Sequence, residues 1–103
     1  MKREIKLSEL RERKVNLFFH SQNIPLLIDP KFLRSKQCGQ VDCCVFDAKK
    51  TLIKIIEVKG RAGISQTQLN RLRGTSQLLG LIFNCAVLLK TAIFENDNGF
   101  KTY

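Results

Sequence analysis

The first hydrophobic positions along the chain follow a helical period. Leu10, Leu17 and Phe18 recur at the spacing of one helix face. Ser8 precedes them and is a residue type that caps helices, so the pattern predicts an amphipathic helix over residues 8–22. Asn23 is expected to end that helix.

Short apolar runs then replace the helical period. Residues 24–28 contain Pro25, which is typical of a strand start or an edge strand. Residues 29–40 are polar and basic and are predicted to be a loop or an irregular edge segment. Residues 41–47 and 52–59 are rich in apolar and β-branched side chains and are predicted to be strands of one hairpin around the turn DAKK. Both strands are apolar on both faces, as in the centre of a covered sheet.

The last part of the chain predicts a second helix followed by strands. Glycines at residues 60–63 interrupt the second strand, and Ser65 is expected to cap a helix that runs to about residue 83. Residues 85–94 read as a third central strand, and NDNG at 96–99 predicts a turn into a short terminal strand. The expected apolar stripe of the helix is Leu69, Leu72, Ser76 and Leu79, and its polar stripe is Gln66, Asn70, Arg73 and Gln77.

This order of elements, α-β-β-β-α-β with a further short strand, predicts an α/β fold. We expect a small mixed sheet with a helix on each side. The 103 residues are enough for one domain, 1–103, and the 44% hydrophobic content is enough for a core. So small a domain leaves apolar surface uncovered, which a homodimer would supplement.

Charge narrows the choice of partner. The 18 basic and 9 acidic residues give a net charge of +9, which favours a polyanion, with nucleic acid ahead of an acidic membrane surface. The four cysteines form no C-x-x-C pair and have no histidine at zinc-finger spacing, so we expect reduced thiols in a cytoplasmic protein. The start of the chain has no signal-peptide pattern, and no apolar run is long enough for a membrane span.

One acid stands out against this charge. Between residues 48 and 90 there are eight Lys or Arg residues and a single acid, Glu57. Residues i and i+2 of a strand share a face, so Glu57 and Lys59 project together, and hairpin pairing is expected to bring Asp42 opposite Glu57. Two adjacent carboxylates repel unless a cation lies between them, and hard oxygen ligands, with the Val58 carbonyl as a third, suit Mg²⁺ or Mn²⁺. Such an ion can polarise a phosphate and activate water, with Lys59 assisting.

These residues resemble a known nuclease signature. The pattern is similar to the D-x(n)-(D/E)-x-K motif of the PD-(D/E)XK nuclease superfamily, with Asp42 followed after fourteen residues by Glu57-Val58-Lys59. Gly60 and the segment ISQTQLNRL, with Gln68 nine residues after Lys59, resemble virus-type replication-repair nuclease (VRR-NUC) domains. The helix-first order and small size also resemble archaeal-type Holliday junction resolvases.

The resemblance covers roughly residues 8–94, and its specific part is residues 41–72. It implies a three-layer α/β/α core like that of restriction endonucleases, two metal-binding acids, a catalytic lysine and a glutamine near the active site. Carried over residue by residue, these are Asp42, Glu57, Lys59 and Gln68. The chain has Val41 rather than proline before the first acid.

Several positions keep two interpretations. Many superfamily members add a glutamate from the first helix, and Glu12 is preferred here over Glu9, which also suits a helix start. Gln66 competes with Gln68. Six basic residues are expected to contact nucleic acid, with a solvated surface as the alternative for each: Lys31, Arg34, Lys36, Arg61, Arg71 and Arg73.

Together these features predict a metal-dependent nuclease that hydrolyses phosphodiester bonds in DNA as a structure-specific or non-specific endonuclease. One alternative is a dimeric Holliday junction resolvase. Another is a non-catalytic basic module that binds nucleic acid on a nuclease-like fold. An RNA-binding protein is disfavoured because no predicted strand face carries an aromatic cluster.

Overall fold

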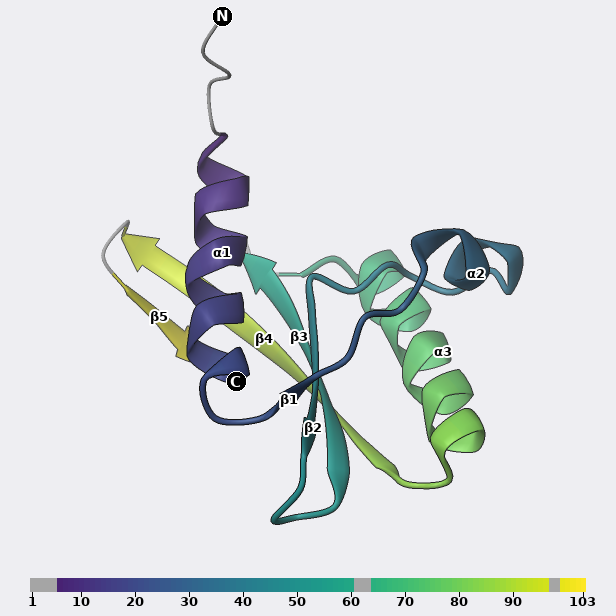
Figure 1. Cartoon of the computed structure of the whole chain (residues 1–103). Helices are drawn as coiled ribbons and strands as arrows, with labels where there is room; N and C mark the ends of the chain where they lie inside the picture. Colours follow the sequence, from purple (N-terminus) through teal and green to yellow (C-terminus); the bar gives the residue numbers. More distant parts are fainter. Residues whose placement is uncertain (1–5, 61–63, 97–98) are drawn as a thin grey trace, which may run out of the picture.

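The computed structural model is a small α/β protein built on a five-stranded mixed sheet (Figure 1). It describes residues 6–60, 64–96 and 99–103. The elements in chain order are α1 (Leu7–His20), β1 (Ile24–Pro25), α2 (Pro30–Ser35), β2 (Cys43–Asp47), β3 (Leu52–Lys59), α3 (Gln66–Phe83), β4 (Ala86–Asn96) and β5 (Gly99–Thr102).

The strands lie in the sheet in the order in which they occur along the chain. The β1–β2, β2–β3 and β4–β5 pairs are antiparallel, whereas β3 and β4 are parallel. A parallel pair needs a long crossover, and α3 supplies it. The predicted hairpin and helix-linked third strand are therefore confirmed, and β3 has the predicted bounds.

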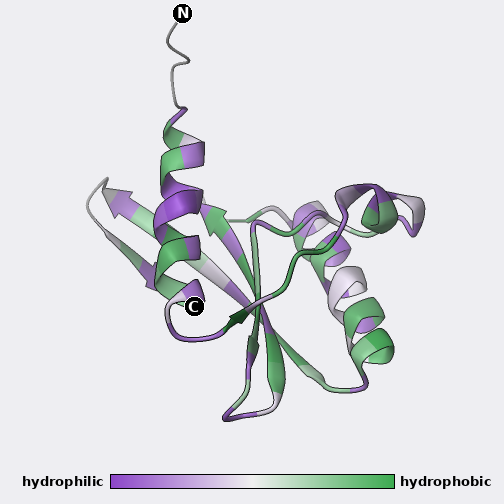
Figure 2. Cartoon of the chain, in the orientation of Figure 1, coloured by the Kyte–Doolittle hydropathy of each residue, from purple (hydrophilic) through white to green (hydrophobic). Residues whose placement is uncertain are grey.

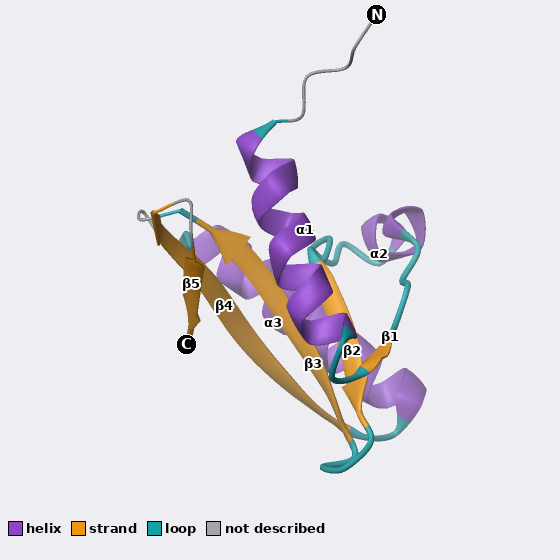
Figure 3. Ribbon diagram, turned by 60° about the vertical axis from the view of Figure 1, so that its left-hand side comes forward, coloured by secondary structure: helices purple, strands orange, loops and turns teal. Residues whose placement is uncertain are grey.

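The helices α1 and α3 pack on opposite faces of the sheet (Figures 1 and 3). Val15 and Phe19 of α1 join a buried cluster with Cys43 of β2, and Leu72 of α3 joins a second cluster with Cys44. Because alternate strand residues face opposite sides, the adjacent cysteines point into different clusters. Both thiols are free, and burial raises their pKa values to about 12 for Cys43 and about 11 for Cys44.

The hydrophobic residues are concentrated where the helices pack on the sheet. Figure 2 shows them concentrated on the central strands and on the C-terminal half of α3. In the described part of the chain, no helix is both long and apolar enough to cross a membrane.

The first helix begins differently from the prediction. Lys6 is its N-cap and makes no side-chain capping bond, so Ser8 lies inside the first turn together with Glu9. The helix ends at His20, and Asn23 then donates from Nδ2 to the Phe19 carbonyl oxygen. The second predicted cap is confirmed, because the Ser65 side chain accepts a hydrogen bond from the Gln68 N–H at the start of α3.

The segment predicted as a loop at residues 29–40 contains a helix, α2. Asp29 is its N-cap and accepts a bond from the Lys31 N–H at 2.9 Å, and Pro30 occupies the first turn. Leu33 anchors the helix because its side chain is fully buried. The preceding run at 24–28 forms only a two-residue edge strand, paired with Phe46 and Val45 of β2.

Candidate active site

Two acids meet where β2 begins and β3 ends. Cys43 pairs with Ile56, so Asp42, one residue earlier, lies beside Glu57, as the hairpin register predicted. An Asp42 carboxylate oxygen, Oδ2, accepts a hydrogen bond from the Val58 N–H at 2.9 Å. The first acid is thereby fixed to the backbone of the strand that carries the second.

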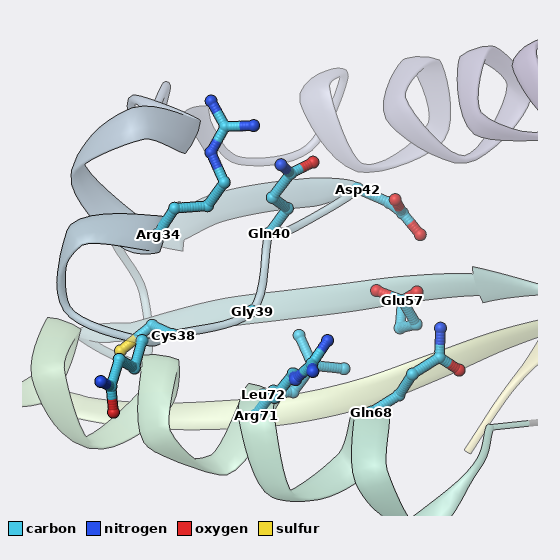
Figure 4. Close-up of a pocket in the computed structure, with 10 residues that line it drawn as sticks. Arg34, Cys38, Gly39, Gln40, Asp42, Glu57, Gln68, Arg71 and Leu72 are labelled. Atoms are coloured by element: carbon cyan, nitrogen blue, oxygen red, sulfur yellow. The ribbon is translucent and has the colours of Figure 1, made fainter.

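The Glu57 side chain is buried, with 8% of the residue exposed. Burial, followed by the charge of Asp42 and a hydrogen bond shared with it, raises the pKa of Glu57 to about 7, although Lys59 acts in the opposite direction. Figure 4 shows Asp42 and Glu57 pointing toward each other from neighbouring segments of the sheet. Glu57 can therefore hold or release a proton near neutral pH.

Lys59 lies on the same face of β3 as Glu57. Its Nζ is 3.5 Å from Glu57 Oε1, and 23% of the lysine side chain is exposed, against 10% of the glutamate side chain. The predicted strand geometry for this pair is therefore confirmed. The lysine side chain is partly exposed, so its ammonium can contact both the carboxylate and a ligand from solvent.

The first helix adds a third acid to the group. Burial, then the charge of Asp42 and a hydrogen bond shared with it, raises the pKa of Glu12. Asn16, one helical turn later, donates from Nδ2 to the Glu12 carbonyl oxygen at 2.8 Å and to the Asp42 carbonyl oxygen at 3.2 Å. Of the two candidate glutamates on α1, Glu12 therefore contacts Asp42 directly.

The three acids form a chain with Asp42 in the middle. A hydrogen bond between two carboxyl groups requires a proton on one of them, and Glu57, with its pKa raised to about 7, can hold such a proton near neutral pH. The described residues contain no cluster of three or more His, Cys, Asp or Glu side chains that is arranged to hold a metal ion. The donor set of Asp42 and Glu57 is nevertheless of the hard-oxygen type that divalent cations prefer, and a cation would replace the shared proton.

An open groove of about 800 Å³ leads to these acids. Gln68 reaches it from α3 and extends toward Glu57 (Figure 4). Gln66, the competing glutamine, instead donates from Nε2 to Asn70 Oδ1 at 3.0 Å on the exposed side of the helix. The residues that line the groove are Arg34, Gln37, Cys38, Gly39, Gln40, Asp42, Glu57, Gln68, Arg71 and Leu72.

One wall of the groove is the segment between α2 and β2, and it is attached to α3 at Gly39. The Gly39 N–H donates to the Arg71 carbonyl oxygen at 3.3 Å. The fully buried Thr75 hydroxyl donates to the Gly39 carbonyl oxygen at 2.8 Å and lies 3.1 Å from the Arg71 carbonyl oxygen. A Cβ on residue 39 would lie 3.1 Å from the Arg71 Cβ, so this close approach favours glycine.

The predicted basic residues separate into three groups. Arg34 and Arg71 line the groove, on the side of α2 and on α3. Lys31, Lys36 and Arg73 are exposed but do not line it. Arg61 lies outside the described residues.

Asn16 and Gln40 were not predicted as site residues. Asn16 follows Glu12 by four positions, the spacing that places two residues on one side of a helix, so the sequence contained a signal for it. Gln40 lies in the irregular segment before β2, where no such periodicity applies. Cys38 and Gly39 had no comparable signal, because their place in the groove depends on the packing of α2 near α3.

Comparison with protein-family models, with curated proteins and with solved structures finds no match to this chain.

Proposed function

We propose that this protein is a metal-dependent nuclease that hydrolyses phosphodiester bonds in DNA. The observation that carries the proposal is the meeting of Asp42, Glu57 and Lys59 at the end of a groove that also contains Arg34 and Arg71. An ordinary surface ion pair would not bury its acid against a second acid, because that arrangement is costly without a ligand. With α1 and α3 on opposite faces of the sheet, we further propose a three-layer α/β/α core of the restriction-endonuclease type.

Asp42 and Glu57 would hold the divalent cation, Mg²⁺ or Mn²⁺, with the Val58 carbonyl oxygen as a further candidate ligand. When bound, such an ion supplies Lewis-acid polarisation of a phosphate and lowers the pKa of water. Glu12 adjoins Asp42 and can orient it or accept a proton beside it.

The other side chains have separate tasks. Lys59 Nζ, held 3.5 Å from Glu57, can hydrogen-bond an attacking water or an equatorial phosphate oxygen. The Gln68 amide can orient the same water, since it offers both a donor and an acceptor beside Glu57. Arg34 and Arg71 can bind the phosphates on either side of the cleaved bond, where a guanidinium pairs with two oxygens.

The groove favours recognition of the sugar-phosphate backbone over base sequence. The described part of the chain has no helix free to enter a DNA major groove, because α1 and α3 both pack on the sheet and α2 is six residues long. We therefore propose structure-specific or non-specific endonuclease cleavage.

The test is cleavage of labelled linear, flapped and four-way-junction DNA with Mg²⁺, Mn²⁺ or EDTA. We expect metal-dependent cutting that Glu57→Ala and Lys59→Ala each reduce by about 10²-fold or more. Matched controls are Glu95→Ala and Lys50→Ala, which remove one exposed charge of the same sign elsewhere. Binding of DNA without cleavage under every ion would instead identify a non-catalytic binding module, and preference for the junction would identify a resolvase.

A further inference from the structure

The outer edge of β4 is only half covered. β5 pairs with β4 from Ala92 to Asn96, and Tyr103 exchanges two backbone hydrogen bonds with Thr91, at 2.9 and 3.0 Å. Among the described residues, no strand pairs with the outer edge of residues 86–90. Such an edge is a template for another strand.

The hydrogen-bond pattern identifies which backbone groups are open. In a strand, the N–H and C=O of one residue point to one side, and those of the next residue point to the other. Thr91 directs both groups toward Tyr103, so Leu89 and Val87 direct theirs to the same, unpaired side. Their side chains face α3, whereas Leu88 faces the opposite side and is 41% exposed.

The groove between this edge and α3 has no charged lining residue. Residues 74–89 contain no Lys, Arg, Asp or Glu, although the net charge of the chain is +9. A groove of about 500 Å³ between α3 and β4 is lined by Ser76, Gln77, Gly80, Leu81 and Val87, and Leu81 is 81% exposed. Figure 2 shows this hydrophobic end of α3 close to the start of β4.

We infer that this edge binds a second copy of the chain through antiparallel β4–β4 pairing. Two molecules with a charge of +9 repel each other least where both lack charge, and a polyanion has no basic group to bind on residues 74–89. The edge is also self-complementary: with Leu88 opposite Leu88 on the two-fold axis, Val87 of one copy pairs with Leu89 of the other. All four open backbone groups on each copy then form hydrogen bonds.

The Leu88–Leu88 register also fits the length of the open edge. Tyr103 occupies the position opposite Thr91, so a partner strand has room only opposite residues 86–90. β4 itself begins at Ala86, and this five-residue segment pairs with itself without opposing like charges, since Lys90 meets Ala86. A two-fold axis perpendicular to the sheet places both α3 helices on one face, where Leu81 of each copy becomes covered. Dimerisation at this edge is independent of the proposed nuclease activity.

Sedimentation of the full chain up to about 1 mM tests this dimer, because a millimolar dissociation constant would already be visible there. We expect Leu88→Glu to weaken dimerisation roughly tenfold or more, because the substitution places two carboxylates opposite each other on the two-fold axis. In the monomer, the new carboxylate lies beside Lys54, the residue of β3 that pairs with position 88, and this contact favours the monomer further. Leu27→Glu is the matched control, because Leu27 is 93% exposed and follows β1 at the opposite edge.

A second variant tests the same dimer by a gain of signal, an intermolecular cross-link, rather than by weakened dimerisation. In a background with Cys38→Ser and Cys85→Ser, Leu88→Cys is expected to form an intermolecular disulfide on mild oxidation, because non-hydrogen-bonded antiparallel pairs are close enough for one. Leu27→Cys is expected not to do so at the same concentration. A monomer at every concentration, or a dimer that neither Leu88→Glu weakens nor Leu88→Cys cross-links, would overturn the inference.

Discussion

At the scale of single residues, Glu57 is the most unusual group in the molecule. Burying a carboxylate costs folding free energy, and the carboxyl group of Asp42 beside Glu57 adds to this cost. The lysine 3.5 Å away offsets part of that cost, yet the pKa of Glu57 is still raised to about 7. This side chain therefore lowers the stability of the fold at neutral pH, a cost that functional sites commonly carry.

Glu57 should make the protein less stable as the pH rises. Its pKa is raised from 4.5 to about 7 on folding, so the stabilisation it gives is complete below pH 4.5 and is lost as the pH rises to 7. The shift corresponds to at most about 3 kcal/mol. Denaturant unfolding of metal-free protein at pH 5 and pH 8 should show this loss, and Glu57→Gln should be more stable than the wild type at pH 8.

The control for this measurement is Glu95→Gln, which changes an exposed glutamate on β4. Because the Glu57 site is intact in this variant, it should still lose stability between pH 5 and pH 8. An identical pH dependence in the wild type and Glu57→Gln would show that Glu57 is not the group that titrates.

A bound cation should reverse the cost that Glu57 imposes. At pH 8, above the pKa of about 7 of Glu57, that side chain is mainly a carboxylate, so Mn²⁺ or Mg²⁺ between Asp42 and Glu57 should raise the melting temperature. An ion at 100 times its dissociation constant stabilises the fold by about 3 kcal/mol. Thermal unfolding with and without the ion, for the wild type and Asp42→Asn, measures this without any activity assay. Equal stabilisation of both proteins would place the cation elsewhere.

At the scale of elements, the sequence predicted best those segments whose pattern is local. β3 and α3 have a long apolar run or a clear cap, and their observed bounds agree with the expected ones. The helix α2 was missed because its six residues bury mainly Leu33, although Asp29 followed by Pro30 is a helix-start signal. Hairpin register was enough to bring Asp42 to Glu57, but the wall at Gly39 depends on tertiary packing.

Thr75 should fix that wall to α3. Thr75→Val keeps the shape of the side chain but removes the donor to the Gly39 carbonyl oxygen, so the unfolding free energy should fall by about 1–3 kcal/mol. If the wall also positions Arg34, the KM for DNA should rise more than kcat falls. Ser76→Ala is the matched control, since the Ser76 hydroxyl donates to the Leu72 carbonyl oxygen within α3 and not to the wall at Gly39. Equal effects of both variants on KM would contradict a role for the wall.

At the scale of the whole molecule, charge is distributed unevenly along the chain. The net charge of +9 coexists with an uncharged segment at residues 74–89, while Arg34 and Arg71 lie at the groove that leads to the acids. A polyanion and a second copy of the chain would therefore bind to different surfaces. We expect that a substitution can abolish dimerisation without affecting DNA binding, and the reverse. The Leu88→Glu variant should accordingly keep the salt dependence of DNA binding found for the wild type.

DNA bound along the groove should release counterions at both arginines. The logarithm of the binding constant falls linearly with the logarithm of salt concentration, with a slope of about −0.9 for each neutralised phosphate. Arg34→Ala and Arg71→Ala should each reduce that slope by about one, measured with Ca²⁺ in place of Mg²⁺ to limit cleavage. Lys101→Ala, an exposed charge on β5, is the control and should leave the slope nearly unchanged. Unchanged slopes for both arginine variants, with a reduced slope for Lys101→Ala, would show that DNA approaches the sheet from the β5 side and not along this groove.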